Sequence, residues 1–187
     1  VMPYLRQASM SCDLCPRLCN VDRHSQRGFC GCDDTMRIAR IGLHRYEEPC
    51  ICGDGGSGAV FFSGCTLGCK FCQNEPISHG GVGKPITAER LREIFRELID
   101  RGAACLDLVT PTHFIPVILE ALGEESWPVP VVWNCGGYEK AETLRLLEGK
   151  VQVYLPDLKY ALPEPAGKYS AAADYFDWAS EAILEMF

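Results

Sequence analysis

The amino-acid sequence predicts an α/β fold of four strand–helix units that follow a cysteine-rich amino-terminal segment. Short apolar runs rich in β-branched or aromatic residues occur at 59–62, 106–110, 129–133 and 151–155, and stretches of helical period alternate with them. This order is typical of a parallel sheet covered by helices, either an open sheet or part of a (β/α) barrel. Four units are too few to close a barrel, so we expect a partial barrel or an open four-stranded sheet.

The clearest helix is predicted after Thr87, which is placed as an N-cap, and it ends at Gly102. Its apolar residues recur at helical spacing: Leu91, Ile94, Phe95, Leu98 and Ile99. A second helix follows Tyr138, turns Leu144 and Leu147 inward and ends at Gly149.

A third helix begins after Ser170 and has one apolar face: Tyr175, Trp178, Ala179, Ala182, Ile183 and Met186. Neither Gly, Pro nor a polar tail ends it before Phe187. We therefore expect a truncated or partial sequence.

Composition narrows the class of protein. The 187 residues are 47% hydrophobic and 23% charged, as in a globular domain. The net charge is −7 and no Lys/Arg cluster forms a basic stripe, so nucleic acid is not expected as a partner. No apolar run of 18 residues and no signal-peptide pattern occur in the sequence, which predicts a cytoplasmic protein without a membrane partner.

Twelve cysteines are present, and ten of them fall within the first 72 residues. In a reducing compartment, clustered thiols are better interpreted as metal ligands than as disulfides. We expect a cysteine-rich metal-binding extension over residues 1–57 and the strand–helix units over residues 58–187.

The sharpest motif is Cys65-x3-Cys69-x2-Cys72, which directly follows the first predicted strand. Three thiolates on one loop can bind three irons of a cubane cluster and leave the fourth iron open, whereas structural zinc and ordinary ferredoxin sites take four protein ligands. Glycines at 64 and 68 let such a loop wrap a cluster. A zinc site completed by a fourth cysteine, or three unrelated thiols, is the alternative.

A second group of thiols precedes this motif, and four closely spaced thiols are enough for a tetrahedral site. Structural zinc and a second 4Fe-4S cluster both fit, and the spacing does not decide between them. The proposed ligands are Cys12, Cys15, Cys19 and Cys30, which Cys32 follows; Cys50 and Cys52 are alternative ligands.

The triplet, with an aromatic residue before its last cysteine, resembles the radical S-adenosylmethionine (SAM) superfamily. The flanking segments are similar to those of proteins related to pyruvate formate-lyase activating enzyme. These segments are Cys-x2-Cys-Pro-Arg-x-Cys at 12–19, Glu-Glu-Pro-Cys at 47–50, Cys-Gln-Asn at 72–74, Leu-Val-Thr-Pro-Thr-His at 108–113, Asn-Cys-Gly-Gly-Tyr at 134–138 and Tyr-Leu-Pro-Asp-Leu-Lys-Tyr at 154–160.

The resemblance implies a partial radical SAM barrel with a 4Fe-4S cluster and SAM as cofactors. It implies reductive SAM cleavage, a glycyl-radical enzyme as the protein substrate and a flavodoxin or ferredoxin-type electron donor. Phe71 would border the adenine of SAM. A radical SAM enzyme for another peptide, RNA or small molecule, and a non-catalytic metal or electron-transfer module, are the alternatives.

Family members commonly hold the SAM amino group with Gly-Gly-Glu after the second strand, where this chain has other residues. Asn134, Asp157 and Lys159 follow the third and fourth strands, at the strand ends where such folds build sites. By the resemblance, Asp157 is a candidate to bind a monovalent cation or the cofactor, and Lys159 is a candidate to bind the SAM carboxylate. The alternative is an exposed Asp–Lys ion pair that contributes little to stability. Candidates for the amino group are Thr110, Thr112 and His113, the last of which is alternatively a helix cap.

Overall fold

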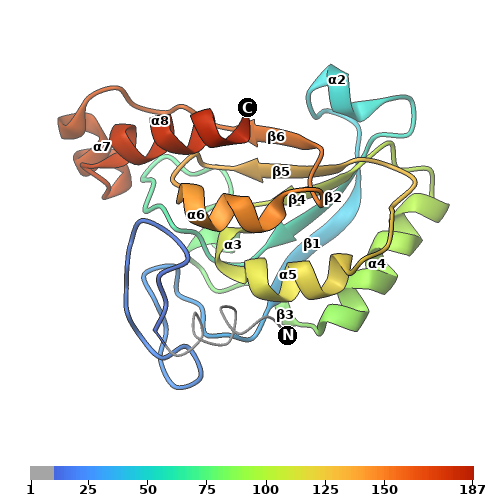
Figure 1. Cartoon of the computed structure of the whole chain (residues 1–187), viewed down its shortest axis with the longest axis horizontal. Helices are drawn as coiled ribbons and strands as arrows, with labels where there is room; N and C mark the ends of the chain where they lie inside the picture. The colour runs from blue at the N-terminus through green and yellow to red at the C-terminus, as the bar shows by residue number, and fades with distance from the viewer. Residues whose placement is uncertain (1–10) are drawn as a thin grey trace.

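The computed structural model describes residues 11–187, which form a mixed α/β fold around a six-stranded sheet of order β3-β1-β2-β4-β5-β6 (Figure 1). Four of these strands are parallel to one another and confirm the four predicted apolar runs. They are β2 (Ser57–Phe62), β4 (Leu106–Val109), β5 (Val131–Cys135) and β6 (Val153–Pro156).

Two antiparallel strands were not predicted: β1 (Arg37–His44) pairs with β2, and β3 (Lys84–Pro85) pairs with β1. The expectation of a four-stranded sheet is therefore wrong. Only Ile38 of β1 is buried, so this strand carries little of the apolar signal that marks a strand in sequence. Within residues 11–187 the sheet ends at β3 and β6, and no closed barrel is present there.

The helix predicted after Thr87 is confirmed as α4 (Ala88–Asp100), because the Thr87 side chain accepts a hydrogen bond from the Arg90 amide at 3.2 Å. The helices predicted after Tyr138 and Ser170 are confirmed as α6 and α8. The other bounds are α2 (Pro49–Cys52), α3 (Glu75–Ser78), η1 (Thr112–Phe114), α5 (Ile115–Leu122), α6 (Ala141–Leu144), η2 (Arg145–Leu147), α7 (Pro163–Ser170) and α8 (Tyr175–Met186).

The helices α4, α5, α6 and α8 lie on one face of the sheet (Figure 1). Alternate strand residues, among them Val60, Leu108 and Trp133, are fully buried beneath them in the main apolar core. The other face carries the intervening residues, and Phe61, Val109, Asn134 and Leu155 stand next to one another there in register. This second face is where a cavity forms.

The amino-terminal loop (residues 11–36) is irregular and packs below the sheet in Figure 1. The strand β1 follows this loop within the segment predicted as an extension, and the division between residues 57 and 58 stays a prediction. None of the helices in the described part of the chain has the length and apolar character needed to cross a bilayer.

Candidate functional site

A cavity of about 900 Å³ opens at the carboxyl ends of the parallel strands. All three cysteines of the triplet line it. Five of the residues predicted to bind the cofactor also line it: Phe71, Thr110, Asn134, Asp157 and Lys159. A smaller hollow of about 460 Å³ lies around Trp127 at the opposite ends of β5 and β6 and has no cysteine in its lining. The larger cavity is therefore the candidate site, since parallel sheets bind ligands at the carboxyl ends of their strands.

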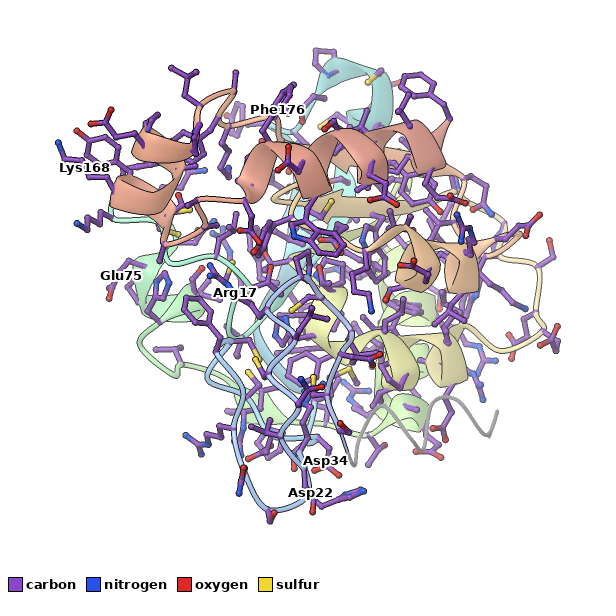
Figure 2. All side chains as sticks on the ribbon, turned by 60° about the vertical axis from the view of Figure 1, so that its left-hand side comes forward. Arg17, Asp22, Asp34, Glu75, Lys168 and Phe176 are labelled. Carbon is purple, nitrogen blue, oxygen red and sulfur yellow. The ribbon has the colours of Figure 1, made fainter. Side chains whose placement is uncertain are left out.

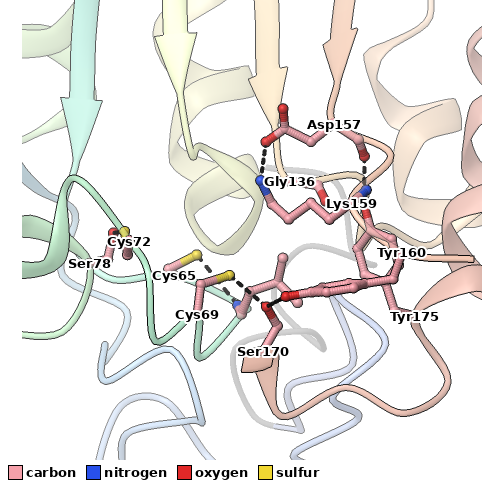
Figure 3. Close-up of polar contacts among 11 residues, drawn as sticks. Cys65, Cys69, Cys72, Ser78, Gly136, Asp157, Lys159, Tyr160, Ser170 and Tyr175 are labelled. Atoms are coloured by element: carbon pink, nitrogen blue, oxygen red, sulfur yellow. Dashed lines mark hydrogen bonds and ion pairs between the residues drawn. The ribbon is translucent and has the colours of Figure 1, made fainter. Parts of the chain in front are cut away.

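The triplet stands on the loop after β2, and each of its sulfurs has one polar neighbour (Figure 3). The Leu67 amide donates to Cys65 Sγ at 3.4 Å. The Ser170 hydroxyl donates to Cys69 Sγ at 2.9 Å, and Cys72 Sγ lies 3.5 Å from Ser78 Oγ. Hydrogen bonds to sulfur are one way in which proteins tune iron–sulfur clusters, so this loop suits thiolate ligands.

As the side chains lie, no three His, Cys, Asp or Glu residues among residues 11–187 are placed to share one metal ion. Burial raises the pKa of the Cys65 thiol to about 12. Metal binding at the triplet therefore requires rotation of cysteine side chains and release of thiol protons.

Gly64, next to Cys65, has a φ of +87°. A Cβ at this position would lie 2.6 Å from the Cys30 carbonyl oxygen and 3.1 Å from His113 Nε2. Only glycine fits both this backbone conformation and this close approach of the amino-terminal loop.

The chain after β6 supplies the charged side of the cavity. Lys159 pairs with Asp157, and both are held by the buried Tyr175. The Tyr175 hydroxyl donates to the Asp157 carbonyl at 2.6 Å and accepts from the Lys159 amide at 3.0 Å. It also lies 2.8 Å from the Gly136 carbonyl, so one side chain fixes the ends of β5 and β6 relative to each other.

Thr110 and Phe71 occupy other walls of the cavity. Thr110 has a φ of +58°, a sparsely populated conformation for a residue other than glycine, and its amide donates to the Asn134 carbonyl at 2.8 Å. The Phe71 ring is 60% exposed and meets the Tyr160 ring edge-on with a centroid distance of 6.5 Å. One face of the aromatic ring thus remains available to a ligand.

A family model described as "4Fe-4S single cluster domain" matches residues 51–145, a range that contains the triplet. The chain belongs to this 4Fe-4S single cluster domain family. It is also 32% identical over 176 residues to an uncharacterized protein of Methanocaldococcus jannaschii, an alignment that covers 89% of this chain and 51% of the relative. The chain thus spans about half the length of that curated relative. No solved structure matches it.

Two residues predicted for the cofactor lie outside the cavity of this 4Fe-4S domain. The Thr112 hydroxyl donates to Glu139 Oε1 at 2.6 Å, and His113 Nε2 is 2.7 Å from the Ser63 carbonyl oxygen. Both residues are buried, and burial lowers the pKa of His113. Their contacts are those of structural residues, and a role in cofactor binding stays a prediction.

An acidic group beside the cavity was missed in the sequence. Glu47 and Glu48 line the cavity, and Asp107 lies buried on the neighbouring strand β4. Neither carboxylate oxygen of Asp107 has a hydrogen-bond partner within the described residues. Burial raises the pKa of Asp107 to about 7, and the charge of Glu47 adds to this shift. The Glu-Glu-Pro segment was a signal for this group, whereas Asp107 was hidden in an apolar run.

The cysteines of the amino-terminal loop lie close to one another. Burial raises the pKa of the Cys12 thiol and of the Cys15 thiol, and neighbouring thiolates raise both further: Cys30 and Cys19 act on Cys12, and Cys12 and Cys30 act on Cys15. The alternative ligands Cys50 and Cys52 lie on α2, at the opposite end of the molecule from this loop in Figures 1 and 2.

The amino-terminal loop is attached to the triplet loop through Arg17 (Figure 2). Its guanidinium donates to the Thr66 carbonyl at 2.7 Å and to the Ser170 carbonyl at 3.3 Å. The same group lies 3.7 Å from the centre of the Phe29 ring. The two cysteine-bearing loops are therefore parts of one packed region.

Proposed function

We propose that this protein is a radical SAM enzyme in which Cys65, Cys69 and Cys72 each bind one iron of a 4Fe-4S cluster. The observation that carries the proposal is that three thiols, rather than four, come from one loop and face a large cavity at the carboxyl ends of the parallel strands. Membership of a 4Fe-4S cluster family supports the cluster. The resemblance of the triplet and its flanking segments supports SAM as its partner and a partial barrel as the fold.

A reduced cluster with one open iron supplies the electron that cleaves SAM to methionine and a 5′-deoxyadenosyl radical. In the proposed site the residues of this chain bind and orient SAM and exclude water. The exposed Phe71 ring borders the adenine, and the Lys159 ammonium binds the carboxylate of SAM. Asp157, which now pairs with Lys159, is left to bind the SAM amino group or a cation.

Thr110 and Asn134 complete the binding site in place of the Gly-Gly-Glu run of other activating enzymes. Their backbones are already joined by a hydrogen bond, and the φ of Thr110 turns the chain sharply at the end of β4. A residue held in such a conformation at a cavity wall is a common feature of binding sites. We assign the two side chains to polar contacts with the methionine part of SAM.

The proposed reaction on the substrate is hydrogen abstraction from a backbone glycine of a glycyl-radical enzyme, with flavodoxin or a ferredoxin as electron donor. The second candidate is a radical SAM enzyme for a small molecule or peptide that carries a cationic group. The carboxylates of Glu47 and Glu48 in the cavity lining favour this second substrate class.

SAM cleavage tests the enzyme class. Anaerobically reconstituted protein reduced with dithionite should convert SAM to 5′-deoxyadenosine, measured by liquid chromatography. Cys69→Ala removes one cluster ligand and should abolish this product. Cys105→Ala is the matched control, because this buried cysteine is not part of the cavity lining and its loss should leave the product unchanged. Full activity in the Cys69 variant would refute the proposal.

Deuterium transfer separates the two substrate classes. A glycine-loop peptide of pyruvate formate-lyase, dideuterated at its glycine, should pass deuterium into 5′-deoxyadenosine. If the protein forms unlabelled 5′-deoxyadenosine with this peptide but takes deuterium from a deuterated cationic substrate, the glycyl-radical assignment is wrong and the second candidate replaces it.

A further inference from the structure

The backbone of the amino-terminal loop brings distant cysteines together. The Cys12 amide donates to the Val21 carbonyl and the Asn20 amide donates to the Cys12 carbonyl, both at 2.9 Å. This pairing brings Cys12 beside the segment that follows Cys19. The Leu18 amide donates to the Cys15 carbonyl at 3.1 Å and closes the turn between these two cysteines.

A second turn adds Cys30 to the group. The Phe29 amide donates to Cys19 Sγ at 3.3 Å, the kind of N–H···S contact found around metal-bound thiolates. A Cβ at Gly28 would lie 3.4 Å from Cys19 Sγ and 3.7 Å from Cys30 Sγ. The two sulfurs therefore flank the same small space.

A buried positive charge lies beside these thiols. Arg23 is 3% exposed, donates to the carbonyls of His113 and Asp33, and has a buried Nε without a hydrogen-bond partner. It forms no ion pair with a carboxylate within the part of the chain that the structure describes. An arginine charge in such surroundings is costly unless an anionic group balances it.

We propose that Cys12, Cys15, Cys19 and Cys30 bind one metal centre, a zinc ion or a 4Fe-4S cluster, whose negative charge Arg23 balances. As at the triplet, the cysteine side chains must rotate toward one another to share the metal. Four thiolates around either core leave a net charge of about −2, which explains why a guanidinium is buried here without a carboxylate. The centre is separate from the cluster of the proposed function and does not depend on it.

The neighbouring Cys32 is assigned a different role. Its thiol donates to the Ser63 carbonyl at 3.3 Å and also lies beside the Cys30 thiol, so its sulfur stands between the end of β2 and the four proposed ligands. A side chain on Gly64 would collide with this sulfur. We assign Cys32 to the contact between the two loops and not to the metal, so it tests whether the ligand set is limited to the other four cysteines.

The centre would hold the amino-terminal loop in place against the triplet loop. This loop has no helix or strand before β1, and a metal bound by its cysteines supplies the folding energy that such a segment lacks. Through Arg17 and Cys32 the loop contacts Thr66 and Ser63 on either side of Cys65. Loss of the metal should therefore loosen the support of the triplet loop.

Metal analysis tests the ligand set. The Cys65/Cys69/Cys72→Ala variant, supplied anaerobically with zinc or with iron and sulfide, should keep about one zinc or about four irons per chain. Adding Cys15→Ser or Cys30→Ser should remove this metal, whereas adding Cys32→Ser should not. A triple variant without metal, or metal that survives the Cys15 and Cys30 substitutions, overturns the proposal. Metal loss with Cys32→Ser overturns the proposed ligand set.

Alkylation of the folded wild-type chain gives a measurement that needs no substitution. Cys19 and Cys30 are half-buried and would react with iodoacetamide if they were free, as the exposed Cys50 should. With metal bound, mass spectrometry should find Cys50 labelled and the other two protected until a chelator is added. Equal labelling of all three before chelation contradicts a metal centre.

The role of Arg23 is tested by the rate of metal release to a coloured chelator. Arg23→Met removes the charge and should weaken metal binding by roughly 10- to 100-fold, the range known for residues that support metal ligands, which we expect to appear as faster release. Arg23→Lys keeps the charge and should show a smaller effect. Release from Arg23→Met at the wild-type rate would refute the charge balance.

Discussion

Replacement of Asp107 by Asn should stabilise the protein, and increasingly so as the pH rises. Asp107 is fully buried, and burial together with the charge of Glu47 raises its pKa from 3.8 to about 7. Between these two pH values the folded state binds a proton that the unfolded state has lost. The folded state therefore loses stability as the pH rises through this window.

The size of the effect follows from the shift. From pH 5 to pH 8, the ionisation of Asp107 should cost wild-type protein about 2 to 3 kcal/mol, and the Asn variant escapes this cost. The melting temperature of the variant minus that of the wild type should grow by about 4 to 12 °C between these two pH values.

Thermal unfolding of both metal-loaded proteins at pH 5, 6, 7 and 8 measures this difference. Glu47 faces Asp107, and Glu48 and His44 lie beside Glu47. These three groups titrate in both proteins, so most of their contribution cancels when the melting temperature of the wild type is subtracted from that of the variant. Glu47→Gln is the control: it removes a neighbouring charge and should shrink the pH-dependent gain of Asp107→Asn. A gap between wild type and Asp107→Asn that stays constant with pH would refute a buried, proton-binding Asp107.

Three further substitutions test local features. Gly64→Ala should destabilise the protein by at least about 2 kcal/mol and lower the iron retained per chain, because both the positive φ and a nearby carbonyl exclude a Cβ. The control Gly81→Ala, at φ +69° in open space, should cost only about 1 kcal/mol. Equal losses of melting temperature in the two variants would contradict the close contact at Gly64. Thr87→Ala should cost about 1 kcal/mol of unfolding free energy, with Thr87→Ser near wild type; a neutral alanine would refute the N-cap. Tyr175→Phe removes a hydroxyl bonded to three backbone groups and should cost about 1 to 3 kcal/mol in urea unfolding, and an unchanged midpoint would show that these bonds contribute nothing.

The parallel strands were predictable because their apolar residues are continuous; β2, β4 and β5 are mostly buried and β6 is half-buried. The strand β1 was not, because only one of its residues is buried and it carries Arg37 and Arg40, and because its pairing with β2 depends on contacts that sequence patterns do not record. The helix α7 was missed because Pro163, Pro165 and Gly167 are unfavourable inside a helix. The two prolines are tolerated here because both lie in the first turn of the helix.

Some residues of the candidate site could likewise be predicted from the sequence and others could not. The triplet and the strand-end residues Asn134 and Asp157 were predictable, because the carboxyl ends of parallel strands meet at one edge of a sheet. Thr112 and His113 were expected beside them, but after Thr110 the chain enters a 3-10 turn that carries both residues away from the cavity. Such a change of direction is set by one backbone torsion, which residue types alone do not indicate.

The most direct test of the central claim is electron paramagnetic resonance of the dithionite-reduced protein before and after SAM is added. If the triplet holds a 4Fe-4S cluster with one open iron, the wild type should show a reduced-cluster signal that changes on SAM binding. The Cys65/Cys69/Cys72→Ala variant should lack the SAM-responsive signal, whatever the amino-terminal cysteines bind. A wild-type spectrum that SAM leaves unchanged would contradict the account.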